Sequence, residues 1–184
     1  MKALNHLRTI NHHKILVMRH CFKVGLYKQG LLHDLSKYSP TEFRVGCKYY
    51  QGTRSPNNAE REATGYSTAW LHHKGRNKHH YEYWIDYSEN PGEGIVGQKM
   101  PMKYVYEMLM DRIAASKTYM GKNYTDQAPL DYYEKGAAKL GNMIHPETAA
   151  TLHKLLVMLA TQGERKTFKY VRAQVMELKN QHLV

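Results

Sequence analysis

Apolar side chains recur at steps of three and four residues along the first part of the chain, which predicts an amphipathic helix over residues 3–27. The apolar stripe of this helix consists of Leu7, Ile10, Val17, Cys21 and Val24. A short second helix is expected after Gly30, because three leucines follow it closely. Ser39 and Pro40 predict the start of a third helix, since serine is a favoured N-cap and proline fits the first helical turn.

The middle of the chain alternates between loop composition and helical spacing. Residues 51–58 contain glycine, proline and asparagine and are expected to form a loop. A helix is expected over about 59–73, and Gly75 is a candidate for its interruption. The aromatic-rich segment 77–87 is expected to be helical again, whereas 88–97 is rich in glycine and is expected to be an irregular loop.

Helical spacing dominates the rest of the chain. Pro101 suits the first turn of a long helix that reaches about Met120. The buried face of that helix is expected to carry Val105, Met108, Leu109 and Ile113. Two or three more helices are expected beyond it, with starts near Pro129 and Pro146 and ends near Gly141 and Gly163. No segment alternates convincingly with the period of two that a half-buried strand requires.

The expected fold class is therefore all-α, with one domain over residues 1–184. Its length of 184 residues suits one domain, and 42% hydrophobic residues is too many for a disordered chain. Within this domain, a core is expected over about 3–121 and the C-terminal helices over about 128–180. No apolar run is long enough to cross a bilayer, and no signal peptide is visible, so a cytoplasmic protein without a membrane partner is expected. Cys21 and Cys47 are expected to be free thiols, with a disulfide as the alternative.

The formal net charge of +11 favours anionic partners such as nucleotides, phosphorylated metabolites or nucleic acid. It does not choose among them, and a solvated basic surface explains the same number. The chain also contains 12 histidines that do not form a tag-like tract. Imidazole is a common ligand of divalent metals, so this number directs attention to a metal site.

The sharpest local signal is the adjacent pair His33 and Asp34, which follows an apolar run. Both side chains are polar and would need partners if they were buried. A divalent cation would satisfy both, because imidazole and carboxylate are good ligands for zinc, manganese, iron or nickel. The alternative interpretation is a histidine at a helix end that is hydrogen bonded to its neighbour.

Further ligands must come from other helices. His6, His13 and His20 are seven residues apart and share one face of the first helix. His13 and His20 lie beside the apolar stripe and are expected to face inward better than His6. Asp111 stands in the middle of an apolar helix, where aspartate is unfavourable, so it is expected to bind a cation or a buried donor. A salt bridge from Asp111 to Arg112 or a lysine is the alternative.

The order His13, His33-Asp34 and Asp111 resembles the H…HD…D pattern of the HD superfamily of metal-dependent phosphohydrolases. The segment LLHDLSK is similar to the LLHDIGK segment of that superfamily, with serine in place of glycine. Nearly two-thirds of the chain, through GLLHDLSKYSPTEF, WLHHKGRNKHHYEYW and MPMKYVYEMLMD, resembles an uncharacterised bacterial and phage family of HD-like proteins. The resemblance implies a helical bundle in which three helices supply the metal ligands, and it favours His13 over His20.

A second metal position is implied by similarity to HD proteins that carry two additional histidines. The candidates are His73 with either His79 or His80, and the spacing of seven residues favours His80. Asp34 could then bridge both ions, and His79 or Glu42 could support the ligands from outside. The expected catalytic residues are Asp34, Lys37 and His79. The expected phosphate-binding residues are Lys37, Arg76, Asn77 and Lys78.

The expected function is hydrolysis of a nucleotide or another phosphate ester by a metal-activated water. The cofactor would be one or two divalent ions, with manganese, iron, nickel, cobalt, zinc and magnesium all open. One alternative is a di-iron oxygenase on the same scaffold. The other is a non-catalytic basic protein that binds nucleic acid, although no known nucleic-acid motif is visible. An oligomer is compatible with the sequence.

Overall fold

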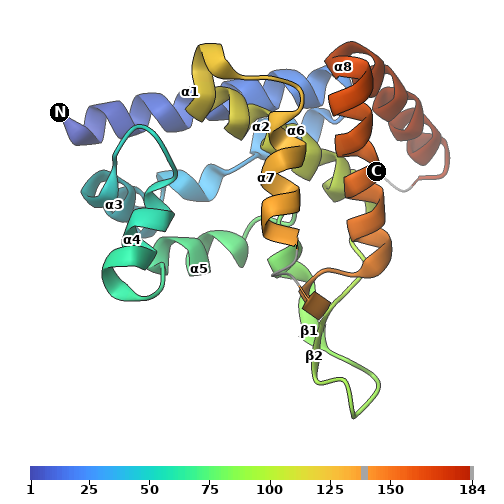
Figure 1. Cartoon of the computed structure of the whole chain (residues 1–184), viewed down its shortest axis with the longest axis horizontal. Helices are drawn as coiled ribbons and strands as arrows, with labels where there is room; N and C mark the ends of the chain where they lie inside the picture. Colours follow the sequence, from blue (N-terminus) through green and yellow to red (C-terminus); the bar gives the residue numbers. More distant parts are fainter. Residues whose placement is uncertain (138–140, 183–184) are drawn as a thin grey trace.

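A computed structural model describes residues 1–137 and 141–182, and it confirms the all-α, single-domain prediction (Figure 1). The α-helices are α1 (Lys2–Lys23), α2 (Tyr27–Leu32), α3 (Pro40–Tyr49), α4 (Pro56–Thr64), α5 (Thr68–Lys74), α6 (Met102–Met120), α7 (Ala128–Ala137) and α8 (Pro146–Asn180). Short 3-10 helices cover Leu35–Tyr38, Tyr81–Trp84, Gly121–Asn123 and Gly141–Met143. The strands β1 (Ile85–Tyr87) and β2 (Ile95–Gly97) form a small antiparallel hairpin.

The hydrophobic core is built around α6, which packs between α1 and α8. Its fully buried members include Val17 and Cys21 of α1, Leu109 and Ile113 of α6, and Leu156 of α8. A helix that is covered on most of its circumference has few places for a polar side chain. Glu107 and Asp111, the two carboxylates in the middle of α6, must therefore find polar partners inside the protein.

The first helix is shorter than predicted, because it ends at Lys23 rather than near residue 27. The chain turns at Gly25, whose φ of 84° is a conformation that glycine adopts readily. The second helix was expected after Gly30 but begins before it and contains it. A side chain at Gly30 would lie 3.2 Å from the backbone of Met18, so this glycine allows α2 to pack closely against α1. The third helix begins at Pro40, as predicted.

The prediction of one helix over about 59–73 is wrong. The structure has two helices there, α4 and α5, which separate at Gly65 with a φ of 84°. The first of them begins at Pro56, inside the segment that was expected to be a loop.

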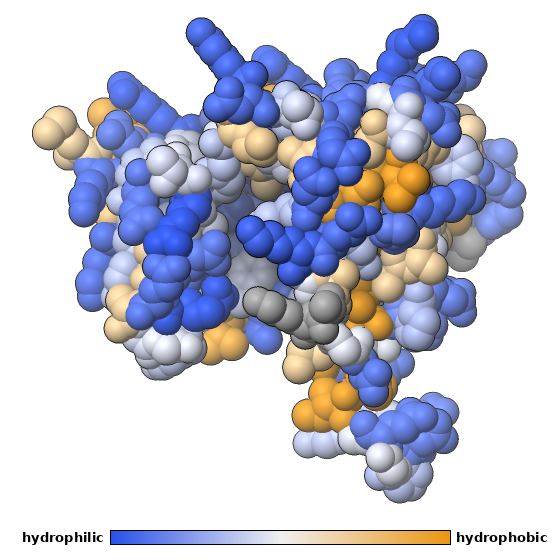
Figure 2. Space-filling model, in the orientation of Figure 1, coloured by the Kyte–Doolittle hydropathy of each residue, from blue (hydrophilic) through white to orange (hydrophobic). Residues whose placement is uncertain are grey.

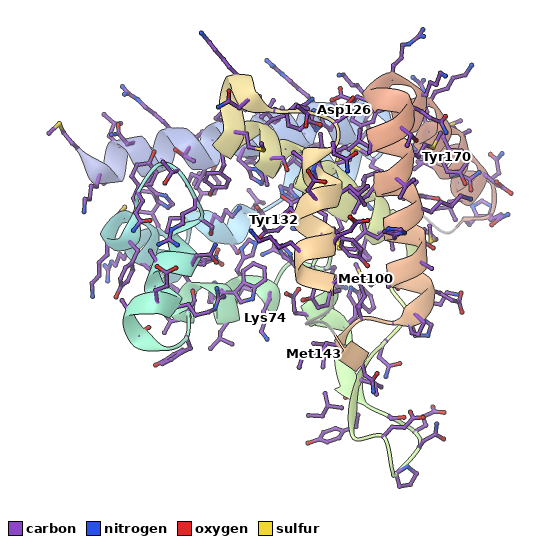
Figure 3. All side chains as sticks on the ribbon, viewed as in Figure 1. Lys74, Met100, Asp126, Tyr132, Met143 and Tyr170 are labelled. Carbon is purple, nitrogen blue, oxygen red and sulfur yellow. The ribbon has the colours of Figure 1, made fainter. Side chains whose placement is uncertain are left out.

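The prediction of a helix over 77–87 is also wrong. That segment forms a turn, a 3-10 helix and β1, and β2 occupies the end of the expected loop 88–97. The hairpin projects from the helices (Figure 1) and exposes Tyr87 and Ile95. Apolar surface is visible near its base (Figure 2), where Met143 approaches the strands (Figure 3). A side chain at Gly97 would lie 2.6 Å from the backbone oxygen of Met143, so this contact requires glycine.

The long helix through Met120 is confirmed by α6, and the helix start near Pro146 by α8. Pro129 lies in the first turn of α7, and Gly163 interrupts α8 with non-helical angles (φ 80°, ψ 166°) near the place where an end was expected. The end expected near Gly141 adjoins 138–140, outside the described residues. Both cysteines are free, and no described helix combines the length and apolar character of a membrane span.

Candidate metal centre

The pair His33 and Asp34 lies between the end of α2 and the 3-10 helix Leu35–Tyr38. The ammonium group of Lys14 donates to the backbone oxygens of Leu31 (3.0 Å) and His33 (2.7 Å), so it satisfies carbonyls that the helix end leaves free. Asp34 adopts a left-handed conformation with φ 54° and ψ 26°, which aspartate tolerates better than most residues. Both side chains are directed into the protein, and each residue is 2% exposed.

The first group of candidate ligands consists of His13, His33, Asp34 and Asp111, which the structure brings together from α1, the end of α2 and α6. Each offers one atom, and these atoms lie within 4.8 Å of one another. His13 Nε2 lies 2.9 Å from Asp111 Oδ1, and His33 Nε2 lies 3.2 Å from Asp34 Oδ2. The geometry matches the set that the sequence pattern proposed.

The second group consists of Asp34, His73, His79 and His80. The helix α5 ends at Lys74, so His73 and His80 do not share a helical face. The turn that follows brings His79 and His80 back, and the Nε2 atoms of His73 and His80 approach to 2.9 Å. The sequence left a choice between His79 and His80, and the structure places both in the group.

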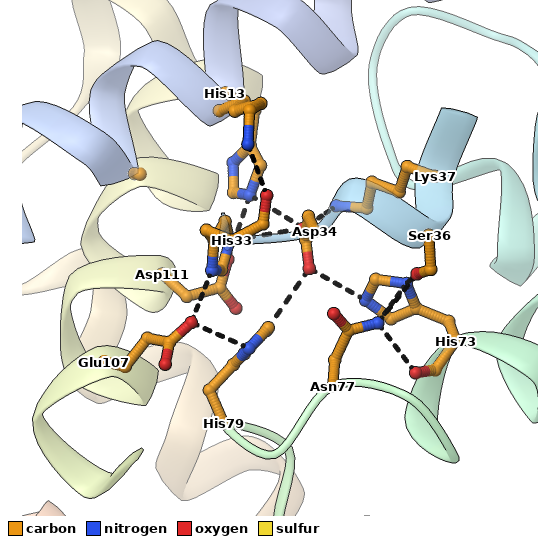
Figure 4. A network of polar contacts seen from close by, with 12 residues as sticks. His13, His33, Asp34, Ser36, Lys37, His73, Asn77, His79, Glu107 and Asp111 are labelled. Carbon is orange, nitrogen blue, oxygen red and sulfur yellow. Dashed lines mark hydrogen bonds and ion pairs between the residues drawn. The ribbon is translucent and has the colours of Figure 1, made fainter. Parts of the chain in front are cut away.

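Asp34 belongs to both groups and faces each with a different oxygen (Figure 4). Its Oδ2 faces the first group, and its Oδ1 lies 3.2 Å from His73 Nε2 and 3.4 Å from His79 Nε2. Lys37 contacts the same carboxylate, with 2.5 Å between Nζ and Oδ2. Asp34 is thus placed as a bridging carboxylate between two positions.

Several of the atoms that face these positions are buried and make no hydrogen bond among the described residues. They are His13 Nε2, His33 Nε2, His79 Nε2 and Asp34 Oδ1, whereas Asp34 Oδ2 is contacted by Lys37. A buried polar atom without a partner is costly, and most such atoms in proteins are satisfied. These atoms converge on shared positions. Imidazole nitrogens and carboxylate oxygens are good metal ligands, so the arrangement fits the binding of cations there.

Two glutamates support the histidines from outside. Glu107 Oε1 accepts from His33 Nδ1 at 2.9 Å and from His79 Nδ1 at 3.2 Å. Glu42 accepts from His73 Nδ1 at 2.8 Å and from His72 Nδ1 at 2.6 Å. An imidazole that donates from Nδ1 presents a free lone pair on Nε2, which is the arrangement of metal-bound histidines.

The sequence had suggested Glu42 for such a supporting role, but Glu107 was missed. Glu107 precedes Asp111 by four residues and so shares its helix face. Glutamate is a good helix former, so the low helix preference that marked Asp111 gives no signal for Glu107; only its position among apolar residues could have identified it. Burial alone would raise the pKa of Glu107, but the donors His33 and His79 outweigh burial and lower it below its ordinary value.

The carboxylates of the centre are charged in spite of their burial. Burial opposes the ionised form of Asp34, but His33 and Lys37 outweigh it and hold the pKa well below its ordinary value. The pKa of Asp111 is likewise well below its ordinary value, because His13 and His33 outweigh the effect of burial. Burial also opposes the charged form of Lys37, yet Asp34 and Asp111 raise its pKa. Burial likewise opposes the charged form of His33, yet Asp34 and Asp111 raise its pKa well above its ordinary value. The metal-free centre therefore combines ionised carboxylates with buried cationic side chains, which metal ions would displace or join.

The other residues predicted to bind phosphate, Arg76, Asn77 and Lys78, belong to neither ligand group. Asn77 is buried and donates to Ser36 Oγ and to the backbone oxygen of His73, each at 2.8 Å, so it holds the turn. Arg76 and Lys78 are exposed and contact the backbone of His72 and the ring of Tyr83, outside both ligand groups.

The remaining histidines of α1 lie outside both ligand groups. His20 packs against Phe168, with 5.3 Å between the ring centroids. His6 is only 6% exposed, so the expectation that it faces inward less well than its neighbours is wrong. Its ring fills the space beside Gly46, where any side chain would collide with His6 Nε2.

Comparison with known proteins gives one family. The family described as "Family of unknown function (DUF5662)" matches residues 2–158, which include every candidate ligand. No curated protein and no solved structure matches the chain. The chemistry of the site must therefore be argued from its own residues.

Proposed function

The chain belongs to the family of unknown function DUF5662, and we propose that it is a metal-dependent hydrolase of phosphate esters. The observation that carries this proposal is the sharing of Asp34 between two groups of four candidate ligands. Two-metal sites that act on phosphate esters use such a bridging arrangement to place two cations a few ångströms apart. The resemblance of His13, His33-Asp34 and Asp111 to the HD pattern supports the same reaction class.

The charge of the site supports the binding of cations. Asp34, Asp111, Glu42 and Glu107 are four carboxylates with lowered pKa values, and Lys37, which is not a candidate ligand, balances only one of these negative charges. The donors are imidazole nitrogens and carboxylate oxygens, which suit manganese, iron, cobalt, nickel or zinc. Bound there, such ions would supply Lewis acidity toward a phosphoryl oxygen and would lower the pKa of a water molecule.

The residues of this chain would bind and orient the phosphate. The side chain of Lys37 is 29% exposed and that of Asp111 15%, whereas those of His33 and Asp34 are at most 2% exposed. Lys37 and Asp111 therefore mark the open side of the centre. Lys37 is charged, and its ammonium group would contact a phosphate oxygen of the ester from this side as a positive point charge. The net charge of +11 favours the approach of an anion.

The proposal is tested by phosphate release from a panel of nucleotides and other phosphate esters. The protein is loaded with manganese, cobalt or nickel, and its metal content is measured by elemental analysis. We expect hydrolysis of at least one ester by the wild type and a loss of at least about 100-fold in Asp34→Asn. Asparagine also tolerates a positive φ, so this variant keeps the turn and removes the charge.

The matched control is Asp86→Asn, because Asp86 is exposed on β1, away from the centre. This variant is expected to hydrolyse the ester at the wild-type rate. A wild type that binds metal and releases no phosphate from any ester would refute the hydrolase proposal.

A second candidate function is a di-iron oxygenase, which the nitrogen-rich donor set favours. Five histidines and two aspartates form the two ligand groups, and such donors bind iron well. Iron in aerobically purified protein, with a near-ultraviolet absorption of an oxo bridge, would support the oxygenase. Full activity with redox-inert zinc or magnesium would exclude it.

A further inference from the structure

We propose that Glu107 is a positioning residue that couples the two cation positions, so that filling one favours filling the other. This inference rests on the proposed function, because it needs both groups of ligands to bind metal. It concerns Glu107 Oε1, which belongs to neither of the two four-residue ligand groups. This oxygen accepts from one histidine of each group.

The geometry makes one oxygen common to both groups. Glu107 Oε1 accepts from His33 of the first group at 2.9 Å and from His79 of the second at 3.2 Å. The two rings lie side by side with centroids 4.4 Å apart, and Glu107 is 5% exposed, so water competes little for its carboxylate. Because both Nδ1 atoms donate, Glu107 fixes the tautomer of both rings and directs both Nε2 atoms toward the cations.

Coupling between the two cation positions follows from their shared use of Glu107 Oε1. A cation on His33 Nε2 withdraws charge from the ring and strengthens the donation from its Nδ1 to Glu107. The glutamate is then held more firmly in the position that orients His79 for the second cation. The negative charge of Glu107 also opposes the repulsion between the two ions.

Glu42 provides a matched comparison in the same protein. It is also a buried glutamate that accepts from two histidines, His73 at 2.8 Å and His72 at 2.6 Å. Only His73 belongs to a ligand group, so Glu42 supports the second position alone. Glu107→Gln and Glu42→Gln make the same chemical change and differ in how many positions they affect.

The first experiment measures stepwise binding of zinc by calorimetry in the presence of a competing chelator. The wild type is expected to bind two equivalents, with the second bound no more weakly than the first. In Glu42→Gln, one equivalent should bind as in the wild type and the other about 10- to 100-fold more weakly. In Glu107→Gln, both equivalents of zinc should bind about 10- to 100-fold more weakly than in the wild type. Two equivalents in the wild type with only one weakened in Glu107→Gln would overturn the coupling.

The second experiment needs no metal and uses nuclear magnetic resonance of protein with ¹⁵N-labelled histidine. In the chelator-treated wild type, His33 and His79 should both be protonated on Nδ1, as donation to Glu107 requires. Glu107→Gln should change both rings, whereas Glu42→Gln should change His72 and His73. A wild type in which Nδ1 of either His33 or His79 carries no proton overturns the inference, even if a variant fails to fold.

The two experiments separate the failure of this inference from that of the proposed function. A wild type that shows both Nδ1 protons and binds no zinc would contradict the metal centre and, with it, the coupling. A wild type that binds two zinc ions, with only one site affected in Glu107→Gln, would leave the metal centre standing and remove the coupling.

Discussion

At the scale of single residues, His20 is a buried histidine outside both ligand groups that its surroundings keep neutral. Burial against Phe168 is the main cause that lowers its pKa to about 4, and Lys117 and Lys23 act in the same direction. Glu164 acts in the opposite direction but is itself bonded to Lys117. A protonated His20 is therefore poorly accommodated in the folded protein.

Acid should destabilise the protein through His20. In the unfolded chain His20 binds a proton near pH 6.5, whereas in the folded protein it does so only near pH 4. Between these values the unfolded state holds more protons, so stability falls as the pH falls. Between pH 7 and pH 5 this single group should cost about 2 kcal/mol in the free energy of unfolding. Urea denaturation at both pH values measures the change.

The control for this prediction compares two substitutions of the same kind. His20→Phe should lose about 2 kcal/mol less than the wild type between pH 7 and pH 5, because phenylalanine cannot take up the proton. His153→Phe, at an exposed position of α8, should keep the wild-type dependence. Equal pH dependence in all three proteins would show that His20 titrates normally in the folded state.

Single residues also show how far sequence reasoning reaches. His33, Asp34 and Asp111 could be found because a polar group in an apolar stretch needs a partner, and that argument is local. The left-handed backbone of Asp34 could not be found, since its conformation follows from the packing of α2 and the bonds from Lys14. The donation of two histidines to Glu107 is equally invisible, because their positions are set by separate elements.

At the scale of elements, the close packing of α2 against α1 positions the ligand pair at the end of α2. A side chain at Gly30 would lie 3.0 Å from Cys21 Cβ and 3.2 Å from backbone atoms of Met18. Backbone cannot move aside as a flexible side chain does, so Gly30→Ala must push α2 away. We expect a loss of about 1–3 kcal/mol in urea denaturation and weaker zinc binding, since His33 and Asp34 move with α2.

The same substitution at Gly136 is the matched control. Gly136 lies in α7 with no positive φ, and a methyl group added there would meet no atom within 4 Å. Alanine favours a helix over glycine, so Gly136→Ala should leave stability unchanged or raise it by up to about 1 kcal/mol. If both variants lost the same stability, the contact between α1 and α2 would not be the cause.

The elements that could be predicted are those whose periodic pattern is long. The helices α1 and α6 were found because several turns of apolar spacing outweigh local ambiguity. Segment 59–73 was predicted as one helix, although Gly65, with a φ of 84°, and the N-cap Ser67 are local signals of a helix end and of a new helix start. Segment 77–87 was mistaken for a helix because three residues of strand are too short to show a period of two.

At the scale of the whole molecule, the metal centre joins parts of the chain that are far apart in sequence. The candidate ligands come from α1, the end of α2, α5 with its following turn, and α6. They bring together ionised, buried carboxylates and imidazole nitrogens, which are the donors that a divalent cation binds. A cation bound there would cross-link these elements and would bind the folded state only, because the unfolded chain holds the ligands apart.

Chelation should therefore lower the stability of the whole protein and not only its activity. A single site at a free metal concentration of 1000 times its dissociation constant stabilises the folded state by about 4 kcal/mol. For a chain of this size, that energy corresponds to a change on the order of 10 °C in the melting temperature. Differential scanning calorimetry with zinc and then with excess EDTA measures the difference.

Asp34→Asn should show little response to zinc, because both positions lose their common ligand. Asp86→Asn should respond as the wild type does, and an equal response of both variants would mean that zinc binds elsewhere.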